Sequence, residues 1–405
     1  MLPVAEALAR ILASATVLDV QDVPLLAASG RTLARDLAST RSQPPFATSS
    51  MDGYAVRGAD VAEAGAQLRQ IGTSAAGHSF SGTVGPGQTV RIFTGAPLPQ
   101  GADTIVMQEH TSVSGDVVTV QHAVAQGRYI RTAGLDFRTG EILLRAGTRL
   151  GAREIALAAA MNHPHVPVHR KPRVAILATG DELVLPGGAP AADQIIASNN
   201  FAVAAAVESA GGEAHLLPIA TDDFASLEAS IAAARALKAD LLVTIGGASV
   251  GDHDLVQSAL VKEGMTLGFW RIAMRPGKPL MFGKLGNMLM LGLPGNPVSS
   301  IVCSLMFVQP LIRALSGDGE AGRDPAVPAV LGQDMPANDE RQDYVRARIS
   351  GMQDGVPVVI AHQRQDSSML STLAASDALL IRAIHAPSAR AGETCRIIPL
   401  SRLDQ

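Results

Sequence analysis

Apolar runs that alternate with helical patterns mark the middle of the chain, from residue 172 to about 316. The runs at 174–178 and 241–243 suit strands that are buried on both faces, and a helical pattern at 224–237 precedes the second of them. Strands that alternate with helices predict a mainly parallel sheet with right-handed connections. The apolar stretch at 298–315 predicts a long helix.

The two ends of the chain have different patterns. Residues 1 to about 40 predict one or two helices, the first with an apolar stripe that begins at Val4. Residues 57–138 alternate with a period of two and carry a hairpin signal at 114–116, which predicts a small β-barrel or sandwich. After a glycine-rich linker at 317–326, short alternating runs predict a last small β-domain.

Composition excludes several functions. The 405 residues carry a net charge of −4 and only 3% aromatic residues, so nothing favours nucleic-acid binding. Cys303 and Cys395 lie outside any zinc-ligand spacing, which argues against structural zinc or a disulfide framework. The N-terminus lacks the basic start of a signal peptide, and no apolar stretch of about 18 or more residues stands out. We therefore expect a cytoplasmic protein without a membrane partner.

Acidic residues follow three of the predicted strands. They are Asp181 and Glu182, Asp222 and Asp223, and Asp252 and Asp254. Because ligands in open α/β sheets sit at the carboxyl ends of strands, these carboxylates predict a shared hard cation, with Mg²⁺ favoured over Zn²⁺. Asp223 and Asp252 can instead be helix N-caps, since both precede helical patterns.

Glycines and cations predict an anion site at the same edge. Gly246-Gly247 lets the backbone turn tightly and lets a ligand approach its amides. Arg271, Arg275 and Lys278 gather around a Pro-Gly turn, and such groups suit phosphate or another oxyanion. The helix that begins at Pro297 adds free N–H groups for an anion. A solvated turn is the alternative interpretation of the cations.

Segments spread over nearly the whole chain match one family when they are taken together. They are Pro44-Pro45-Phe46, Ser50-Met51-Asp52-Gly53-Tyr54-Ala55, Thr94-Gly95-Ala96, Thr179-Gly180-Asp181-Glu182-Leu183, Gly246-Gly247-Ala248-Ser249-Val250-Gly251-Asp252, Pro276-Gly277-Lys278-Pro279 and Leu293-Pro294-Gly295-Asn296-Pro297-Val298-Ser299. In this order they resemble the molybdenum insertases, the MoeA-type molybdopterin molybdenumtransferases that include the gephyrin E domain.

The resemblance implies a multidomain α/β plus β fold. Its parts are a discontinuous N-terminal domain (1–45 and 139–171), an inserted β-domain (46–138), a three-layer α/β molybdopterin-binding domain with a parallel-type sheet (172–318) and a C-terminal β-barrel (327–405). It further implies an elongated protomer and a homodimer whose cleft uses both subunits. The reaction it implies inserts molybdate into adenylylated molybdopterin and releases AMP, with a molybdopterin adenylyltransferase and molybdoenzyme maturation proteins as further partners.

The resemblance also implies roles for individual residues. The catalytic positions are Asp52, Thr94, Arg131, Asp136, Glu182, Asp222 and Asp254. The positions that bind the cofactor or its oxyanions are Ser249, Arg271, Arg275, Lys278, Pro294, Pro297, Arg346 and Ser367. The positions for Mg²⁺ are Glu182, Asp252 and Asp254.

The chain departs from the family pattern at four positions. Arg271 and Arg275 stand where the family often has lysine, which changes the hydrogen-bonding fork. Leu135 stands in place of a carboxylate. Asp366, which replaces a glycine before Ser367, adds negative charge near the implied anion pocket.

Two other functions fit parts of the pattern. A molybdopterin adenylyltransferase has a fold that resembles residues 172–316, but it does not need the domains on either side. A non-catalytic molybdopterin-binding scaffold is the second alternative, because a fold does not guarantee a function.

Overall fold

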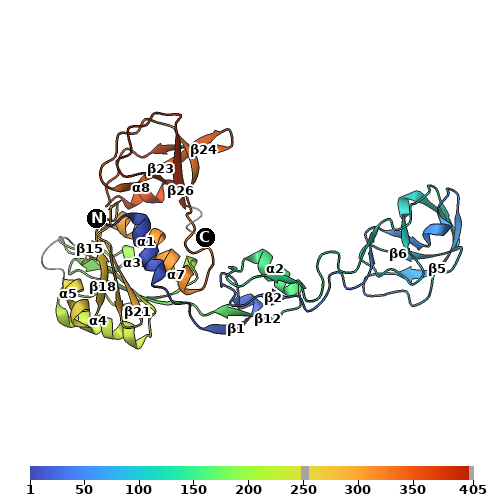
Figure 1. Ribbon diagram of the computed structural model, residues 1–405, viewed down its shortest axis with the longest axis horizontal. Coiled ribbons are helices and arrows are strands. Elements are labelled where there is room, and N and C mark those ends of the chain that lie inside the picture. Colours follow the sequence, from blue (N-terminus) through green and yellow to red (C-terminus); the bar gives the residue numbers. More distant parts are fainter. Residues whose placement is uncertain (248–254, 401–405) are drawn as a thin grey trace.

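The computed structural model describes residues 1–247 and 255–400 and shows an elongated molecule (Figure 1). The α/β domain and the C-terminal barrel lie together at one end. The inserted β-domain forms the other end, and a small mixed domain lies between them (Figure 1). This arrangement confirms the predicted multidomain α/β plus β fold.

The α/β domain is built on one six-stranded sheet, in which β20 alone runs antiparallel to its neighbours. In spatial order the strands are β16 (Glu213–Leu216), β13 (Arg173–Ala178), β17 (Leu241–Ile245), β21 (Met288–Leu293), β20 (Met281–Leu285) and β18 (Thr266–Trp270). The register aligns Ala178 with Ile245 and Ile245 with Leu293, so these strands end level with one another.

Side chains of the strands alternate between two apolar cores, which gives the predicted three layers. Ile176 and Val243 point into one core, whereas Leu177 and Leu242 point into the other. The helices on the first face are α3 (Asn199–Ser209), α6 (Pro297–Cys303), the π-helical segment η4 (Ser304–Val308) and α7 (Gln309–Leu315). Those on the second face are α4 (Phe224–Ala236) and α5 (Leu255–Lys262).

The first helix belongs to this core and not to the N-terminal domain. Helix α1 (Val4–Ala13) buries Val4, Ala7 and Ile11 against the α/β domain. The backbone N–H of Ala273 donates to the carbonyl of Leu2 at 2.7 Å, which anchors the segment before the helix. The prediction that residues 1–45 build the N-terminal domain is therefore wrong for this helix, because its apolar stripe is covered elsewhere.

The prediction of helices up to residue 40 is also wrong after α1. Strand β1 (Val20–Pro24) pairs with β12 (His165–His169), and β2 (Leu37–Ala38) pairs with β11 (Ile142–Leu144). Together with η1 (Leu25–Ala27) and α2 (Ala152–Ala160), they surround a core of their own. The strand partners lie more than a hundred residues away, so no local pattern reveals them.

The continuous helix Pro297–Leu315 contradicts the expectation that the chain has no apolar stretch of about 18 or more residues. Its 19 residues reach a mean hydropathy of 1.7, which is enough by length and composition to cross a membrane, but 78% of the apolar window is buried. The helix lies against α1 and α3 in the core. Burial within the protein accounts for its composition without a membrane.

The inserted domain is a six-stranded sheet at the far end of the molecule. Its strands, in spatial order, are β7 (Thr104–Met107), β4 (Gly53–Val56), β6 (Gln88–Ile92), β5 (Gln67–Ser74), β9 (Val117–Val120) and β8 (Thr111–Ser114). Gly115 and Asp116 form the predicted hairpin turn, with φ +63° at the glycine. The short turns η2 (Gly58–Asp60) and η3 (Gln108–His110) lie between its strands along the chain. Strands β3 (Thr48–Ser49) and β10 (Ile130–Arg131) pair in the connection to the N-terminal domain.

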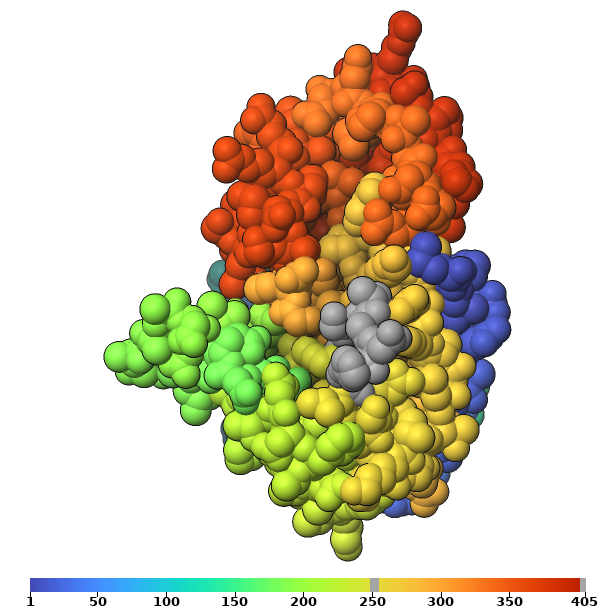
Figure 2. Space-filling view, turned by 90° about the vertical axis from the view of Figure 1, so that its left-hand side faces the viewer, coloured from blue at the N-terminus to red at the C-terminus, as the bar shows by residue number. Residues whose placement is uncertain are grey.

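The C-terminal domain is a closed barrel. Its pairings run through β23 (Gln342–Gln353), β24 (Val356–Ala361), β22 (Val327–Leu331), β26 (Thr394–Pro399) and β25 (Ala378–Arg382), and back to β23. The short helix α8 (Leu370–Ala374) precedes β25. One strand of the α/β domain, β19 (Met274–Arg275), pairs with the start of β23. This pairing holds the barrel against the α/β domain, and Figure 2 shows the two packed together.

Candidate active site

The carboxyl ends of the parallel strands place the predicted residues along one edge, which we call the rim. Thr179 to Glu182 follow β13, Gly246 and Gly247 follow β17, and Pro294 to Pro297 follow β21. Lys278 precedes the antiparallel strand β20, so it reaches the same edge. Because strands lie about 4.8 Å apart, the acids after β13 and the cation before β20 are separated by about 14 Å along the rim. The rim therefore suits an extended ligand.

The acids at one end of the rim influence one another. The carboxylate of Asp181 accepts the backbone N–H of Asp222 at 3.1 Å. Desolvation and the negative charges of Asp181 and Glu182 raise the pKa of Asp222. Asp223 is instead the N-cap of α4 and accepts the N–H of Ser226 at 2.8 Å, which confirms the alternative interpretation for that residue.

Two buried hydroxyl groups at the rim have no hydrogen-bond partner among the described residues. They belong to Thr179, after β13, and to Thr244, within β17. A Cβ atom added at Gly246 would lie 2.9 Å from the carbonyl oxygen of Thr179, and one added at Gly247 would lie 2.2 Å from the side chain of Val256. The two glycines are therefore required by close packing as well as by their positive φ angles of +91° and +65°.

Three predicted residues lie outside the described part of the chain. Ser249, Asp252 and Asp254 belong to the segment 248–254 that follows the glycines. Among the described residues, no group of three or more His, Cys, Asp or Glu side chains is arranged to hold a metal ion. Glu182 folds back toward the backbone, since a Cβ at Gly180 would lie 2.3 Å from its carboxylate.

The cations at the other end of the rim differ in how they are held. Arg271 adopts a left-handed backbone with φ +73°, and its guanidinium stacks on Trp270 at 4.3 Å from the ring centre. Within residues 1–247 and 255–400, the ammonium group of Lys278 forms no ion pair or hydrogen bond. Arg271 also forms no ion pair or side-chain hydrogen bond among the described residues, and its buried Nε has no partner, so either cation can meet an anion without losing one.

The side chain of Arg275 binds residues of the barrel. Its guanidinium pairs with Asp339 at 2.7 Å and with Asp343, and it also donates to Asn338 at 3.0 Å. The bond to Asp343 raises the pKa of Arg275. These partners hold the guanidinium within the protein, and the predicted contact of Arg275 with an oxyanion stays a prediction.

The barrel supplies a loop to the rim. Ser367 accepts a hydrogen bond from the amide of Asn296 at 2.9 Å, and its carbonyl accepts the N–H of Val298 at 3.0 Å. The start of α6 therefore gives one of its N–H groups to the barrel, and the prediction that this end is free for an anion is wrong for that group. Pro297 occupies the first turn of α6 as predicted, and Pro294 is buried beneath it.

Arg346 supports this loop from below. Arg346 is 1% exposed. Its guanidinium donates to the side chain of Gln365 at 3.2 Å and to the carbonyl of Asp366 at 2.8 Å. The carboxylate of Asp366 accepts from the hydroxyl and the N–H of Ser368, which lowers its pKa. The extra acid therefore has hydrogen-bond partners in its own loop, and Arg346 is placed to hold the loop in position.

A second group of predicted residues lies in the inserted domain. The carboxylate of Asp52 accepts both the N–H and the hydroxyl of Thr94 at 2.8 Å, which lowers the pKa of Asp52. Arg91 lies beside them, with its guanidinium 5.0 Å from the ring centres of Tyr54 and Phe93. This cluster lies at the far end of the chain from the rim (Figure 1).

Arg131 and Asp136 lie in the connection between the two small domains. Arg131 pairs with Thr48 in the β3–β10 ladder, and the N–H of Asp136 donates to the carbonyl of Gln43 at 2.9 Å. The sequence predicted a cleft that uses residues of both subunits of a homodimer. In a single chain these residues and those of the rim form two separate groups, and their union in one cleft stays a prediction.

The chain matches known proteins along its whole length. Family models match at residues 2–162 (MoeA N-terminal region, domain I and II), 175–314 (probable molybdopterin binding domain) and 328–400 (MoeA C-terminal region, domain IV). A molybdopterin molybdenumtransferase of Haemophilus influenzae is 34% identical over 93% of both chains. One of Nostoc sp. is 40% identical over 81% of this chain and 76% of the relative.

The chain belongs to the molybdopterin molybdenumtransferase family. A crystal structure of the molybdopterin biosynthesis moeA protein from Pyrococcus horikoshii OT3 superposes with a TM-score of 0.83 at 28% identity, covering 98% of this chain and 99% of that one. These matches confirm the resemblance on which the predicted fold depends.

Several residues near the predicted positions were not singled out from the sequence. Thr244 lies within an apolar run, where a lone hydroxyl was a signal that could have been noticed. Asn199 donates to the carbonyl of Gly295 at 2.7 Å and steadies the turn before α6. The place of Arg91 beside Asp52 and Thr94 follows only from the strand pairing of the inserted domain, in which Arg91 lies opposite Tyr54.

We predict that Asp222 releases its proton at a higher pH than Asp223. The pKa of Asp222 is raised, whereas hydrogen bonds from Thr221 and Ser226 lower the pKa of Asp223. A carbon-detected NMR titration of labelled aspartate checks the order, and Asp181→Asn should lower the pKa of Asp222. Because ionised Asp222 destabilises the fold, Asp222→Asn should raise the thermal midpoint at pH 7, and the gain should vanish below the ordinary carboxyl pKa of about 3.9. An equal or reversed order of the two titrations would show that the rim acids do not repel one another.

We predict that Arg275→Ala loosens the barrel. The change leaves Asp343, which is 9% exposed, without its cationic partner. Since the guanidinium is 41% exposed, we expect a loss of about 1–2 kcal/mol, less than for a fully buried pair. Urea unfolding measures the loss, and proteolysis of the linker at 317–326 should become faster. Arg348→Ala, at an exposed position of β23, is the matched control, and an equal effect of both variants would refute the role of Arg275.

Proposed function

We propose that this protein inserts molybdenum into molybdopterin, using adenylylated molybdopterin and molybdate and releasing AMP. The observation that supports this most strongly is the match to molybdopterin molybdenumtransferases across all the domains. An adenylyltransferase would need only the α/β domain. The barrel contacts the rim through Ser367 and Arg275, so the extra domain is part of the candidate site.

The rim provides groups for both ends of such a substrate. We propose that Lys278 binds phosphate or molybdate oxygens and that Arg271 adds positive charge at the same end of the rim. The hydroxyl groups of Thr179 and Thr244 lack hydrogen-bond partners among the described residues, so a polar partner brought to this edge would be stabilising. Cleavage of a phosphate bond depends mainly on positioning and on neutralising charge, which these fixed groups supply.

The acidic end of the rim fits a divalent cation. Asp181, Glu182 and Asp222 repel one another, as the raised pKa of Asp222 indicates, and a cation would relieve that repulsion. We propose that Glu182 holds Mg²⁺ together with Asp252 and Asp254. When bound, Mg²⁺ would neutralise negative charge on the substrate phosphates. The role of this chain's own residues is to hold that cation opposite Lys278.

A homodimer would unite the two groups of site residues. Asp52, Thr94, Arg131 and Asp136 lie at or near the end of the chain opposite the rim (Figure 1). We propose that the inserted domain of one subunit reaches the rim of the other, because a two-fold axis makes both such contacts equivalent. Cytoplasmic localisation and contacts with an adenylyltransferase and molybdoenzyme maturation proteins remain part of the proposal.

We predict that AMP release from adenylylated molybdopterin and Mg²⁺ is stimulated by molybdate. Lys278→Gln should slow this release on the order of 100-fold, as expected for the loss of one group that stabilises developing charge. Lys284→Gln, at an exposed position in β20, is the control and should leave the rate unchanged. Tight binding of the substrate without AMP release would favour a scaffold, and release that ignores molybdate would exclude insertion.

We predict that two inactive variants restore each other when they form a mixed dimer. Asp222→Asn alters the rim, and Asp52→Asn alters the inserted domain. In a dimer of one chain of each kind, one of the two shared sites retains both unaltered groups, so about half of the original activity should return. The mixed dimer is isolated with two affinity tags and assayed for AMP release. If no activity returns, each chain builds its site alone and the shared-site proposal fails.

A further inference from the structure

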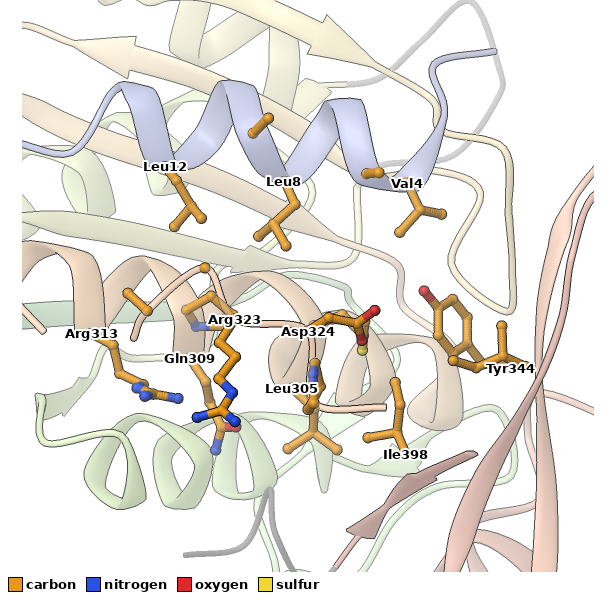
Figure 3. Close-up of a pocket in the computed structure, with 18 of the residues that line it drawn as sticks. Val4, Leu8, Leu12, Leu305, Gln309, Arg313, Arg323, Asp324, Tyr344 and Ile398 are labelled. Atoms are coloured by element: carbon orange, nitrogen blue, oxygen red, sulfur yellow. The ribbon is translucent and has the colours of Figure 1, made fainter. Parts of the chain in front are cut away.

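A cavity of about 620 Å³ lies away from the rim, where three domains meet. Figure 3 shows α1 on one side of it and the helix Pro297–Leu315 on the other, with barrel residues at one end. None of the residues that line it belongs to the predicted site. The volume lies within the range of about 300–1,000 Å³ that is usual for small-molecule sites.

One wall of the cavity is apolar. Leu8 and Leu12 point from α1 toward it, and Leu305 faces them from the opposite helix (Figure 3). Ile398 of the barrel and Val4 continue this wall. Leu305 and Val4 are each 6% exposed, whereas Leu8 and Leu12 are only half-buried, so part of this wall is still exposed to water. An aliphatic body would gain free energy by leaving water for this surface.

The remainder of the cavity is cationic. Four arginines and one acid line it, namely Arg149, Arg313, Arg323, Arg396 and Asp324. Three of the arginines have carboxylate partners, in the pairs Arg313–Asp318, Arg323–Glu320 and Arg396–Asp324. These pairs neutralise most of the positive charge.

Arg149 is the cation that remains without a carboxylate. Its guanidinium donates to the carbonyl oxygen of Ser209 at 2.6 Å, and it forms no ion pair within the described residues. Burial and the neighbouring charge of Arg313 lower the pKa of Arg149, and the negative charge of Asp318, which pairs with Arg313, partly opposes this. A half-buried guanidinium beside an apolar wall is a site for one negative charge.

We propose that this cavity binds an amphiphilic small molecule with a single anionic head group, of the class of medium-chain aliphatic carboxylates. Arg149 holds the carboxylate, and the aliphatic chain lies along Leu8, Leu305 and Ile398. Because Arg149 comes from the N-terminal domain and Ile398 from the barrel, the ligand contacts three domains at once. Binding therefore stabilises their arrangement. This site is independent of molybdenum insertion.

Decanoate is the probe that tests the proposal on the full-length protein. Isothermal calorimetry should show saturable binding of one decanoate per chain, and decanol should bind at least about tenfold more weakly because it lacks the charge. With ¹³C-methyl-labelled methionine, the signal of Met306, which lines the cavity, should shift on titration. Comparison of decanoate with decanol needs no variant, so it tests the charge even if a variant fails to fold.

Two variants locate the site. Arg149→Gln should weaken decanoate binding at least about tenfold and leave decanol unaffected. Arg145→Gln is the matched control, because Arg145 is exposed on the same domain and pairs with Asp36. Leu8→Asn should weaken both ligands. Absence of saturable binding, equal affinity for decanoate and decanol, or insensitivity to Arg149→Gln would each overturn the proposal.

Discussion

The docking of the barrel on the edge of the parallel sheet is the constraint on which the rest of the site depends. Strand β19 leaves the α/β domain and pairs with β23, and Arg275 within it binds Asp339 and Asp343. This contact brings the loop of Ser367 onto the first turn of α6. The rim is consequently a surface of two domains, and the position of Lys278 depends on both of them.

The order of strands in the sheet separates opposite charges along the rim. The acids follow the outer strands β13 and β16, whereas Lys278 and Arg271 lie by β20 and β18. Between them, β17 is followed by Gly246 and Gly247 and β21 by a turn that contains Gly295, and the first two glycines pack closely against Thr179 and Val256. In the proposed reaction, an extended substrate with an anionic end lies along this rim with its negative charge toward Lys278. The strand order therefore determines which end of the rim is acidic and which end is basic.

Much of this organisation is predictable from local sequence. The parallel sheet, helix α4 and the N-cap role of Asp223 follow from periodicity and from residue chemistry, and the structure has them at or within a few residues of the expected places. The rule that ligands bind at the carboxyl ends of parallel strands predicted that Glu182, Asp222 and Lys278 lie along one edge of the sheet. These inferences succeed because they depend on neighbours in the chain or on a general property of α/β sheets.

The failures all involve partners that are distant in sequence. Helix α1 packs outside the N-terminal domain because α7 covers its apolar stripe. Residues of β1 form a strand because they pair with β12. Barrel carboxylates bind Arg275 and loop carbonyls bind Arg346, contacts that the sequence did not predict, and the expected contacts of both residues with oxyanions stay predictions. A cation in a sequence indicates charge, whereas only the fold shows whether another residue has already neutralised it.

The position of bound molybdate tests most directly whether the rim carries the chemistry. Crystals soaked in molybdate can be measured at the molybdenum absorption edge, where the metal gives an anomalous signal. We predict a peak at the carboxyl edge of the sheet, within contact distance of Lys278. A peak only in the cavity of Arg149, or only beside Asp52 with no rim residue of a partner subunit near it, would contradict a catalytic role for the rim.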